Sequence, residues 1–225
     1  METQTVERKA KPKPKHCMFC GKDKSAGEMS REHFVPKCLW FELPNMVVTL
    51  PAHKSCNEAG SQDDEYFRNV LISDGHVANH PHVKRIINGP LRRSRQLKEL
   101  REAIALRPLF TQSGLYLGRQ PIMAVDGARL ERVLKKIVCG VFYKITNRLV
   151  LPTTTVNVSR GTLSPEDAEV LFENRPPHGF GLDDDVFACH YSTDRQYPDV
   201  MICQMQFYGW HSFVGRTIPA DFPLN

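Results

Sequence analysis

The chain has 225 residues, of which 41% are hydrophobic and 24% charged, and it carries a formal net charge of +5. That length allows one generous domain or a small module joined to a larger one, and the composition is that of a globular protein. No apolar run approaches the roughly 20 residues of a membrane-spanning helix, and the basic N-terminus lacks the apolar segment of a secretory signal. We therefore expect a cytoplasmic protein that has no membrane partner.

Positive charge is distributed unevenly along the chain. Lysine and arginine predominate in residues 1–24, 84–107 and 127–150, whereas residues 160–225 carry ten acidic residues against four basic ones. A basic face of this kind suits a polyanion such as nucleic acid. Each basic segment taken alone is more typical of a solvated helix face, but the three together favour nucleic acid.

The first elements of the chain are a tail and a pair of metal-type motifs. Residues 1–15 are predicted to be a disordered basic tail, because their lysine–proline alternation cannot form helix and has nothing to bury. Cys17 and Cys20 then have the two-residue gap of a zinc knuckle, followed by Gly21, which permits a left-handed backbone. His53 and Cys56 repeat that gap at the distance of a second knuckle.

These two motifs predict a structural Zn²⁺ held by one imidazole and three thiolates, from Cys17, Cys20, His53 and Cys56. Cys38 is also close in sequence and is the alternative to His53 as the fourth ligand. His53 is favoured because its two-residue spacing from Cys56 reproduces the knuckle geometry.

Two short strands, residues 28–37 and 44–50, are predicted between the knuckles, and a helix is predicted from Lys54 to residue 73, with Ser61 and Asp64 forming a capping box. Glu32 and His33 are neighbours on the first strand. Because adjacent strand residues point to opposite faces, we expect them to converge only if the backbone twists or bulges there.

In order and spacing, these motifs resemble the zinc-stapled HNH endonucleases of the ββα-metal fold, and the resemblance covers roughly residues 16–70. The motifs that carry it are Cys17-x-x-Cys20, Glu32-His33-x-x-Pro36, Asn45, and His53-x-x-Cys56-Asn57. The resemblance implies that Glu32 and Asn57 bind the catalytic metal ion. It also implies that His33 is the general base and that Asn45 orients it. Glu32 stands where Asp is more usual in the family, and His53 where Cys is more usual.

Phosphodiester hydrolysis needs a deprotonated water, charge relief on the phosphate and help for the leaving oxygen. A histidine with a near-neutral pKa can take the proton, and a divalent ion can meet the other two needs. Glu32 and Asn57 are hard oxygen ligands that suit Mg²⁺ or Mn²⁺, while Lys37 and Lys54 are candidates for phosphate contacts. We therefore expect a metal-dependent endonuclease acting on nucleic acid, with DNA favoured over RNA.

The alternative is a non-catalytic zinc-stapled module that binds nucleic acid or a protein. It requires the same cysteines and basic segments but has no need of Glu32, His33 or Asn57.

The rest of the chain is predicted to form a linker followed by an α+β domain. His76, His80 and His82 fall in a predicted mobile polar loop, and residues 91–107 in a predicted basic helix. A hairpin is predicted within 108–125, a long helix capped by Asp126 follows, and three antiparallel strands are predicted at 186–191, 200–208 and 211–217. The predicted fold class is α+β, divided into a tail (1–15), an HNH module (16–73), a basic helical linker (74–107) and a C-terminal α+β domain with an antiparallel sheet (108–225).

Overall fold

The computed structural model describes residues 16–44, 47–93, 98, 100, 102–165, 178–182, 186–194 and 196–223. These residues form an α+β fold with antiparallel sheets. The α-helices are α1 (Lys54–Ile72), α2 (Pro81–Asn88) and α4 (Gly127–Thr146), and the 3-10 helices are η1 (Lys24–Ala26), η2 (Lys37–Leu39), η3 (Gly75–Val77) and η4 (Leu91–Arg93). The strands are β1 (Met29–His33), β2 (Thr49–His53), β3 (Ile104–Phe110), β4 (Tyr116–Met123), β5 (Thr154–Arg160), β6 (His178–Leu182), β7 (Phe187–Thr193), β8 (Met201–Phe207) and β9 (His211–Pro219). Within the described ranges, no helix is both long and apolar enough to cross a bilayer. The predicted tail, residues 1–15, lies outside those ranges.

The N-terminal part has the predicted order of strand, loop, strand and helix. β1 and β2 pair antiparallel, from Met29 opposite His53 to His33 opposite Thr49, and α1 follows β2 without a break. β2 lies later than the predicted strand 44–50, which ended just before Pro51, because Pro51 is inside β2. A proline is tolerated there since β2 is an edge strand of a two-stranded sheet.

The predicted capping box is wrong. α1 is continuous from Lys54, so Ser61 lies inside the helix, where its hydroxyl donates to the Glu58 carbonyl at 2.9 Å. Ser61 therefore marks no helix start.

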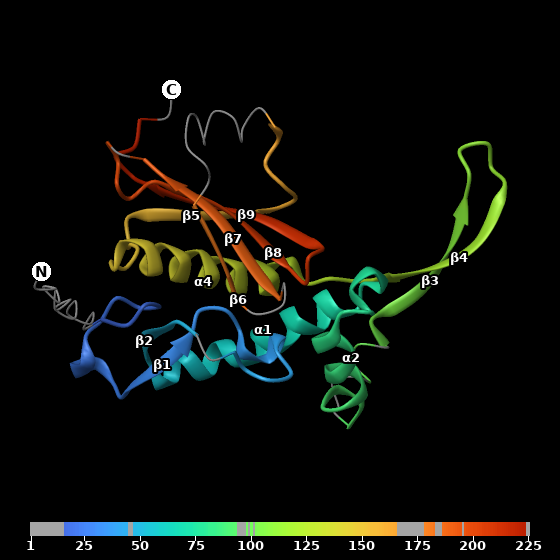
Figure 1. The fold of residues 1–225 in the computed structure, drawn as a ribbon, viewed down its shortest axis with the longest axis horizontal. Coiled ribbons are helices and arrows are strands. Elements are labelled where there is room, and N and C mark those ends of the chain that lie inside the picture. Colours follow the sequence, from blue (N-terminus) through green and yellow to red (C-terminus); the bar gives the residue numbers. More distant parts are fainter. Residues whose placement is uncertain are drawn as a thin grey trace, which may run out of the picture.

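The C-terminal part is a five-stranded antiparallel sheet in the order β5-β9-β8-β7-β6. The three predicted strands are confirmed as β7, β8 and β9, and β5 and β6 extend the sheet on either side. α4 lies against this sheet, and α1 with β1 and β2 lies on the opposite side of α4 (Figure 1). The molecule is thus layered, with α4 in the middle.

α4 is the central element of the core. Asp126 caps it as predicted, with its carboxylate accepting from the backbone of Ala128 and Arg129. Two glycines allow close packing on either side of it. A Cβ on Gly140 would lie 2.1 Å from the Phe34 Cβ, and a Cβ on Gly215 would lie 2.2 Å from Val138 Cγ2. The absence of a side chain at each position brings α4 close to both neighbouring layers.

One hydrophobic core joins the two parts of the chain. Phe67 of α1 packs edge-on against Phe207 of β8 with ring centroids 5.2 Å apart, and Phe34 packs against Phe187 at 6.3 Å. Residues from 16–73 and from 108–225 therefore bury their apolar side chains together.

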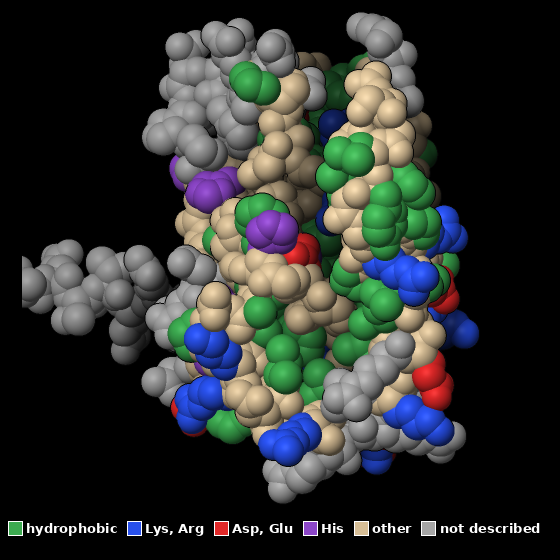
Figure 2. All heavy atoms as spheres, turned by 90° about the vertical axis from the view of Figure 1, so that its right-hand side faces the viewer, with side chains coloured by type: hydrophobic (Ala, Val, Ile, Leu, Met, Phe, Trp, Pro, Cys, Tyr) green, Lys and Arg blue, Asp and Glu red, His purple; other side chains and the backbone are tan. Residues whose placement is uncertain are grey.

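The β3–β4 hairpin stands away from this body (Figure 1). It confirms the predicted hairpin but begins earlier, at Ile104, so residues 104–107 are strand and not the end of the predicted basic helix. Residues 94–97, 99 and 101 of that helix lie outside the described ranges. Every residue of β3 is exposed, including Leu106 and Phe110. Figure 2 looks onto the side from which the hairpin projects and shows hydrophobic side chains on its surface.

The three histidines predicted in a mobile loop lie instead in ordered turns and helix. His76 is in η3, stacked on Trp210 with ring centroids 4.0 Å apart, and His80 precedes the first turn of α2. His82 is buried in α2, where its Nδ1 accepts from the Phe41 backbone at 3.1 Å. The prediction failed because Pro81, read as a loop residue, is at the first position of a helix.

Candidate functional site

The two predicted knuckles come together in space. Cys17, Cys20, His53 and Cys56 each offer one ligand atom, and these four atoms all lie within 4.8 Å of one another. Gly21 has φ +69° and donates to the Cys17 carbonyl, which closes the turn that carries the first two thiols. His53 is the last residue of β2, and Cys56 is in the first turn of α1. The cluster therefore joins the N-terminal turn to the strand–helix corner.

The orientation of His53 is fixed by a backbone carbonyl. Nε2 lies 2.8 Å from the Asp23 carbonyl oxygen, and Nδ1 lies 3.3 Å from Cys20 Sγ. Because a carbonyl oxygen only accepts hydrogen bonds, Nε2 carries the proton and Nδ1 directs its lone pair into the cluster. The Cys38 thiol instead donates to the Asp64 carbonyl at 3.3 Å. The converging group is thus one histidine and three cysteines, a donor set compatible with a structural zinc.

The thiols of this cluster differ in how easily they ionise. Burial raises the pKa of Cys17, but backbone N–H groups, led by that of His53 at 3.3 Å, outweigh it and lower the pKa. Burial and the neighbouring Cys17 raise the pKa of Cys56. Ionising all the thiols at once is unfavourable without a cation between them.

The residues predicted for phosphodiester chemistry line a single cavity of about 330 Å³, here called the His33 cavity. Its wall includes Glu32, His33, Lys37, Lys54 and Asn57, which come from β1, η2 and α1. Asn45 lies outside the described residues, and its orienting role stays a prediction.

Glu32 is 7% exposed and is held by a lysine from α4. Lys136 Nζ donates to Glu32 Oε1 at 2.7 Å and to both carboxylate oxygens of Asp64, at 2.6 and 2.7 Å. The sequence reasoning missed Lys136. Helical spacing offered a signal, because Lys136 lies three residues after Val133 and four before Gly140, on the flank of the apolar stripe.

Asp63 and Asp64 are neighbours in α1, and their pKa values are shifted in opposite directions. Burial raises the pKa of Asp64 to about 6, helped by Glu32 and opposed by Lys136. Asp63 accepts from Arg129 Nε and Arg132 Nε at 2.7 Å each, and these bonds outweigh burial and lower its pKa.

His33 is half-buried at the end of β1. Burial lowers its pKa, Lys37 and Lys136 act in the same direction, and Glu32 opposes them. The imidazole is therefore predominantly neutral at neutral pH and able to accept a proton. β1 and β2 stay in regular register at Glu32 and His33, so no bulge brings the two side chains together. Both line the cavity at the point where the strand ends.

Asn57 is held against β1 by its side-chain amide. Its Nδ2 donates to Ser30 Oγ at 3.2 Å and to the Arg31 carbonyl at 3.3 Å, which anchors the side chain to β1. Lys37 and Lys54 are exposed, and Lys54 Nζ lies 3.8 Å from a Glu28 carboxylate oxygen. Hard oxygen donors and exposed cations therefore share one cavity.

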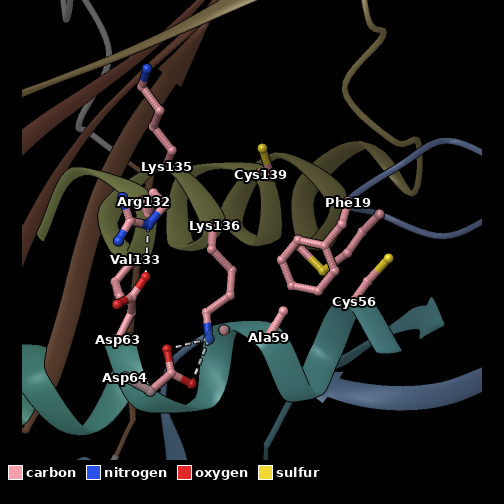
Figure 3. A pocket seen from close by; sticks show the side chains of 12 residues that line it. Phe19, Cys56, Ala59, Asp63, Asp64, Arg132, Val133, Lys135, Lys136 and Cys139 are labelled. Carbon is pink, nitrogen blue, oxygen red and sulfur yellow. Dashed lines mark hydrogen bonds and ion pairs between the residues drawn. The ribbon is translucent and has the colours of Figure 1, made fainter. Parts of the chain in front are cut away.

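A second cavity of about 390 Å³, here called the Phe19 cavity, lies between α1 and α4. Figure 3 shows Lys136 reaching from α4 to Asp64 on α1, with Cys56 and Phe19 further along the same cavity. Asp64 lines both cavities, so the Lys136 ion pair stands between them.

No family model matches this sequence, and comparisons with curated proteins and with solved structures likewise found no match.

Proposed function

We propose that the protein is a metal-dependent endonuclease of the HNH type, which hydrolyses phosphodiester bonds in nucleic acid, with DNA as the expected substrate. One observation carries the proposal: Glu32, His33 and Asn57 line a single cavity with Lys37 and Lys54, beside a cluster of three cysteines and a histidine. The N-terminal order of two strands and a helix is consistent with the ββα-metal arrangement that such a site requires.

In this proposal the neutral imidazole of His33 takes a proton from the attacking water. Glu32 Oε2 and Asn57 Oδ1 are the oxygens that would hold Mg²⁺ or Mn²⁺. Such an ion, when bound, neutralises developing charge on the phosphate and the leaving oxygen. Exposed Lys37 and Lys54 attract the flanking phosphates.

The Cys17, Cys20, His53 and Cys56 cluster would hold a structural Zn²⁺. The donor set and the Asp23 carbonyl behind His53 suit that ion, and the ion would keep β2, α1 and the N-terminal turn in place. Zinc would thereby fix the corner from which Asn57 reaches the cavity.

Cleavage assays test the proposal. Purified protein is incubated with plasmid, single-stranded DNA and RNA in the presence of Mg²⁺ or Mn²⁺. We expect His33→Ala to lower the cleavage rate by about 100-fold or more, since a positioned general base contributes that much. His190→Ala is the matched control, because His190 is an exposed histidine of β7. Equal cleavage by His33→Ala and the parent would refute the catalytic assignment.

One observation favours a second candidate, a non-catalytic zinc-stapled module that binds nucleic acid. Glu32, the proposed metal ligand, already shares one oxygen with Lys136 at 2.7 Å. This candidate predicts binding that weakens with salt, no metal-dependent cleavage, and no effect of His33→Ala on affinity.

A further inference from the structure

A buried lysine adjoins the His33 cavity and has no role in the proposed reaction. Lys136 is 7% exposed, comes from α4, and reaches Glu32 of β1 across 104 positions of sequence. Its ammonium contacts three carboxylate oxygens at 2.6 to 2.7 Å, one from Glu32 and two from Asp64. Elements far apart in the chain therefore meet at one charged group that contacts two side chains of the cavity wall, Glu32 and Asp64.

The charges at this point do not cancel. Glu32 and Asp64 carry two negative charges when ionised, and Lys136 supplies one positive charge. Replacing a buried ion pair by apolar side chains is often neutral for stability, so a need for stability does not by itself explain the lysine. Its position does matter, because Glu32 and Asp64 both line the His33 cavity.

We propose that Lys136 is a positioning residue for the divalent ion of the proposed nuclease, holding Glu32 in place while lowering the affinity of the cavity for that ion. This inference rests on the proposed function. The bond to Oε1 leaves Oε2 as the oxygen free to face the cavity and restrains the rotation of the carboxylate. The ammonium also places a positive charge beside the ion's position, where the two cations repel each other.

The Phe19 cavity makes the lysine replaceable. Lys136 lines it together with Val133 and Ala59, so a methionine at position 136 has apolar neighbours and open space beside it. Lys136→Met would therefore remove the charge and keep the approximate length of the side chain.

Mn²⁺ titration of the full chain, monitored by the paramagnetic resonance signal of the free ion, tests the inference. We expect Lys136→Met to bind Mn²⁺ about tenfold more tightly than the parent or better, because the carboxylates of Glu32 and Asp64 lose their shared cation. We also expect a lower kcat, because Glu32 is no longer held. If Lys136 had a purely structural role, Lys136→Met would lower both the Mn²⁺ affinity and kcat.

The matched control is Lys135→Met. It removes the same charge from the same helix, but Lys135 is paired with Glu131 at the surface, with the two side chains 41% and 53% exposed. Its Mn²⁺ affinity is expected to equal that of the parent. The double variant Glu32→Gln/Lys136→Met should not bind Mn²⁺ more tightly than the parent. That result would show that the tighter binding of Lys136→Met depends on the Glu32 carboxylate.

Unchanged or weaker Mn²⁺ binding by Lys136→Met would overturn the inference. If that variant does not fold, Asp64→Asn decides, because it removes one carboxylate at constant volume and should weaken Mn²⁺ binding. Unchanged binding in Asp64→Asn would likewise overturn it.

Failure of the inference and failure of the nuclease proposal are distinguishable. Tighter Mn²⁺ binding by Lys136→Met without cleavage of any substrate by the parent would retain the role of Lys136 and reject the nuclease. If cleavage depends on His33 but Mn²⁺ binding is the same in Lys136→Met and the parent, the nuclease proposal is retained and the role of Lys136 is rejected.

Discussion

The helix α1 contributes to two groups of converging side chains that could each hold a cation and that are built in different ways. At its start, His53 and Cys56 converge with Cys17 and Cys20 on a common point. Further along, Asp64 and Glu32 converge on the ammonium of Lys136. The first group has soft donors, and an external ion would offset the repulsion among its thiolates. The second is hard, and the chain supplies a cation of its own. One group should therefore depend on metal for stability and the other should not.

The largest effect should come from removing a ligand of the first group. Cys17→Ser or Cys56→Ser should abolish zinc binding and lower the melting temperature by more than about 10 °C, because metal affinity is folding free energy in a small metal-stapled element. Elemental analysis and thermal unfolding measure both outcomes.

Cys38→Ser is the control for these variants, since the Cys38 thiol bonds the Asp64 carbonyl outside the cluster. It should retain one zinc per chain. Pure parent protein without zinc would contradict this side of the comparison.

A smaller effect should follow from separating α4 from β1. In Gly140→Ala the new Cβ meets the Phe34 side chain at 2.1 Å, so α4 must shift away from the segment that follows Glu32. We expect a loss of about 3 kcal/mol in the free energy of unfolding, at the upper end of overpacking effects. Urea unfolding measures it.

Gly60→Ala in α1 is the matched control, because its new Cβ meets nothing within 4 Å. It should stabilise the protein by about 0.5–1 kcal/mol through higher helix propensity. Equal effects of the two substitutions would argue against tight packing at Gly140.

A last effect, at most as large as that of Gly140→Ala, concerns the pH dependence of stability. The pKa of Asp64 is raised from 3.8 to about 6 in the folded protein, so its contribution to stability is present below pH 4 and is lost as the pH rises through 6. Relative to Asp64→Asn, the parent should lose up to about 3 kcal/mol of unfolding free energy over that interval. Urea unfolding at several pH values gives the difference.

The neighbouring Asp63 should show the opposite trend. Its pKa is lowered by Arg132 and Arg129 despite burial, so its contribution is present above the unfolded pKa and is lost as the pH falls through the folded one. The stability of the parent relative to Asp63→Asn should therefore decrease on acidification. Parallel pH trends for the two asparagine variants would contradict this contrast.

Local patterns predicted the parts of the candidate site that depend on short spacings. The two-residue gaps identified the cluster of Cys17, Cys20, His53 and Cys56, because such a gap places two ligands on one turn. The same holds for the hairpin and for the helix capped by Asp126. Two predicted boundaries next to prolines were wrong: the strand 44–50 stopped before Pro51, and the hairpin range 108–125 started at Pro108. Both prolines lie inside edge strands, where a missing N–H is tolerated.

Helical spacing indicates that Lys136 lies beside the apolar face of its helix, but it does not identify Glu32 as the partner of that lysine. The pairing depends on how α4 packs on the N-terminal layer, and that packing is set by Gly140 and Phe34, which lie far apart in the sequence. Asn45 falls outside the described residues, so its part in the site stays a prediction.

The β3–β4 hairpin has a consequence for how the molecule can change. Its strands are largely exposed, and its base is closed where Ala124 donates to the Ala103 carbonyl at 3.3 Å. A segment that leaves and rejoins the body at one point can be shortened, lengthened or exchanged at little cost to the core. The hairpin is therefore a natural position for variation among homologous chains, and for grafting a new recognition element, while the cluster and the His33 cavity stay intact.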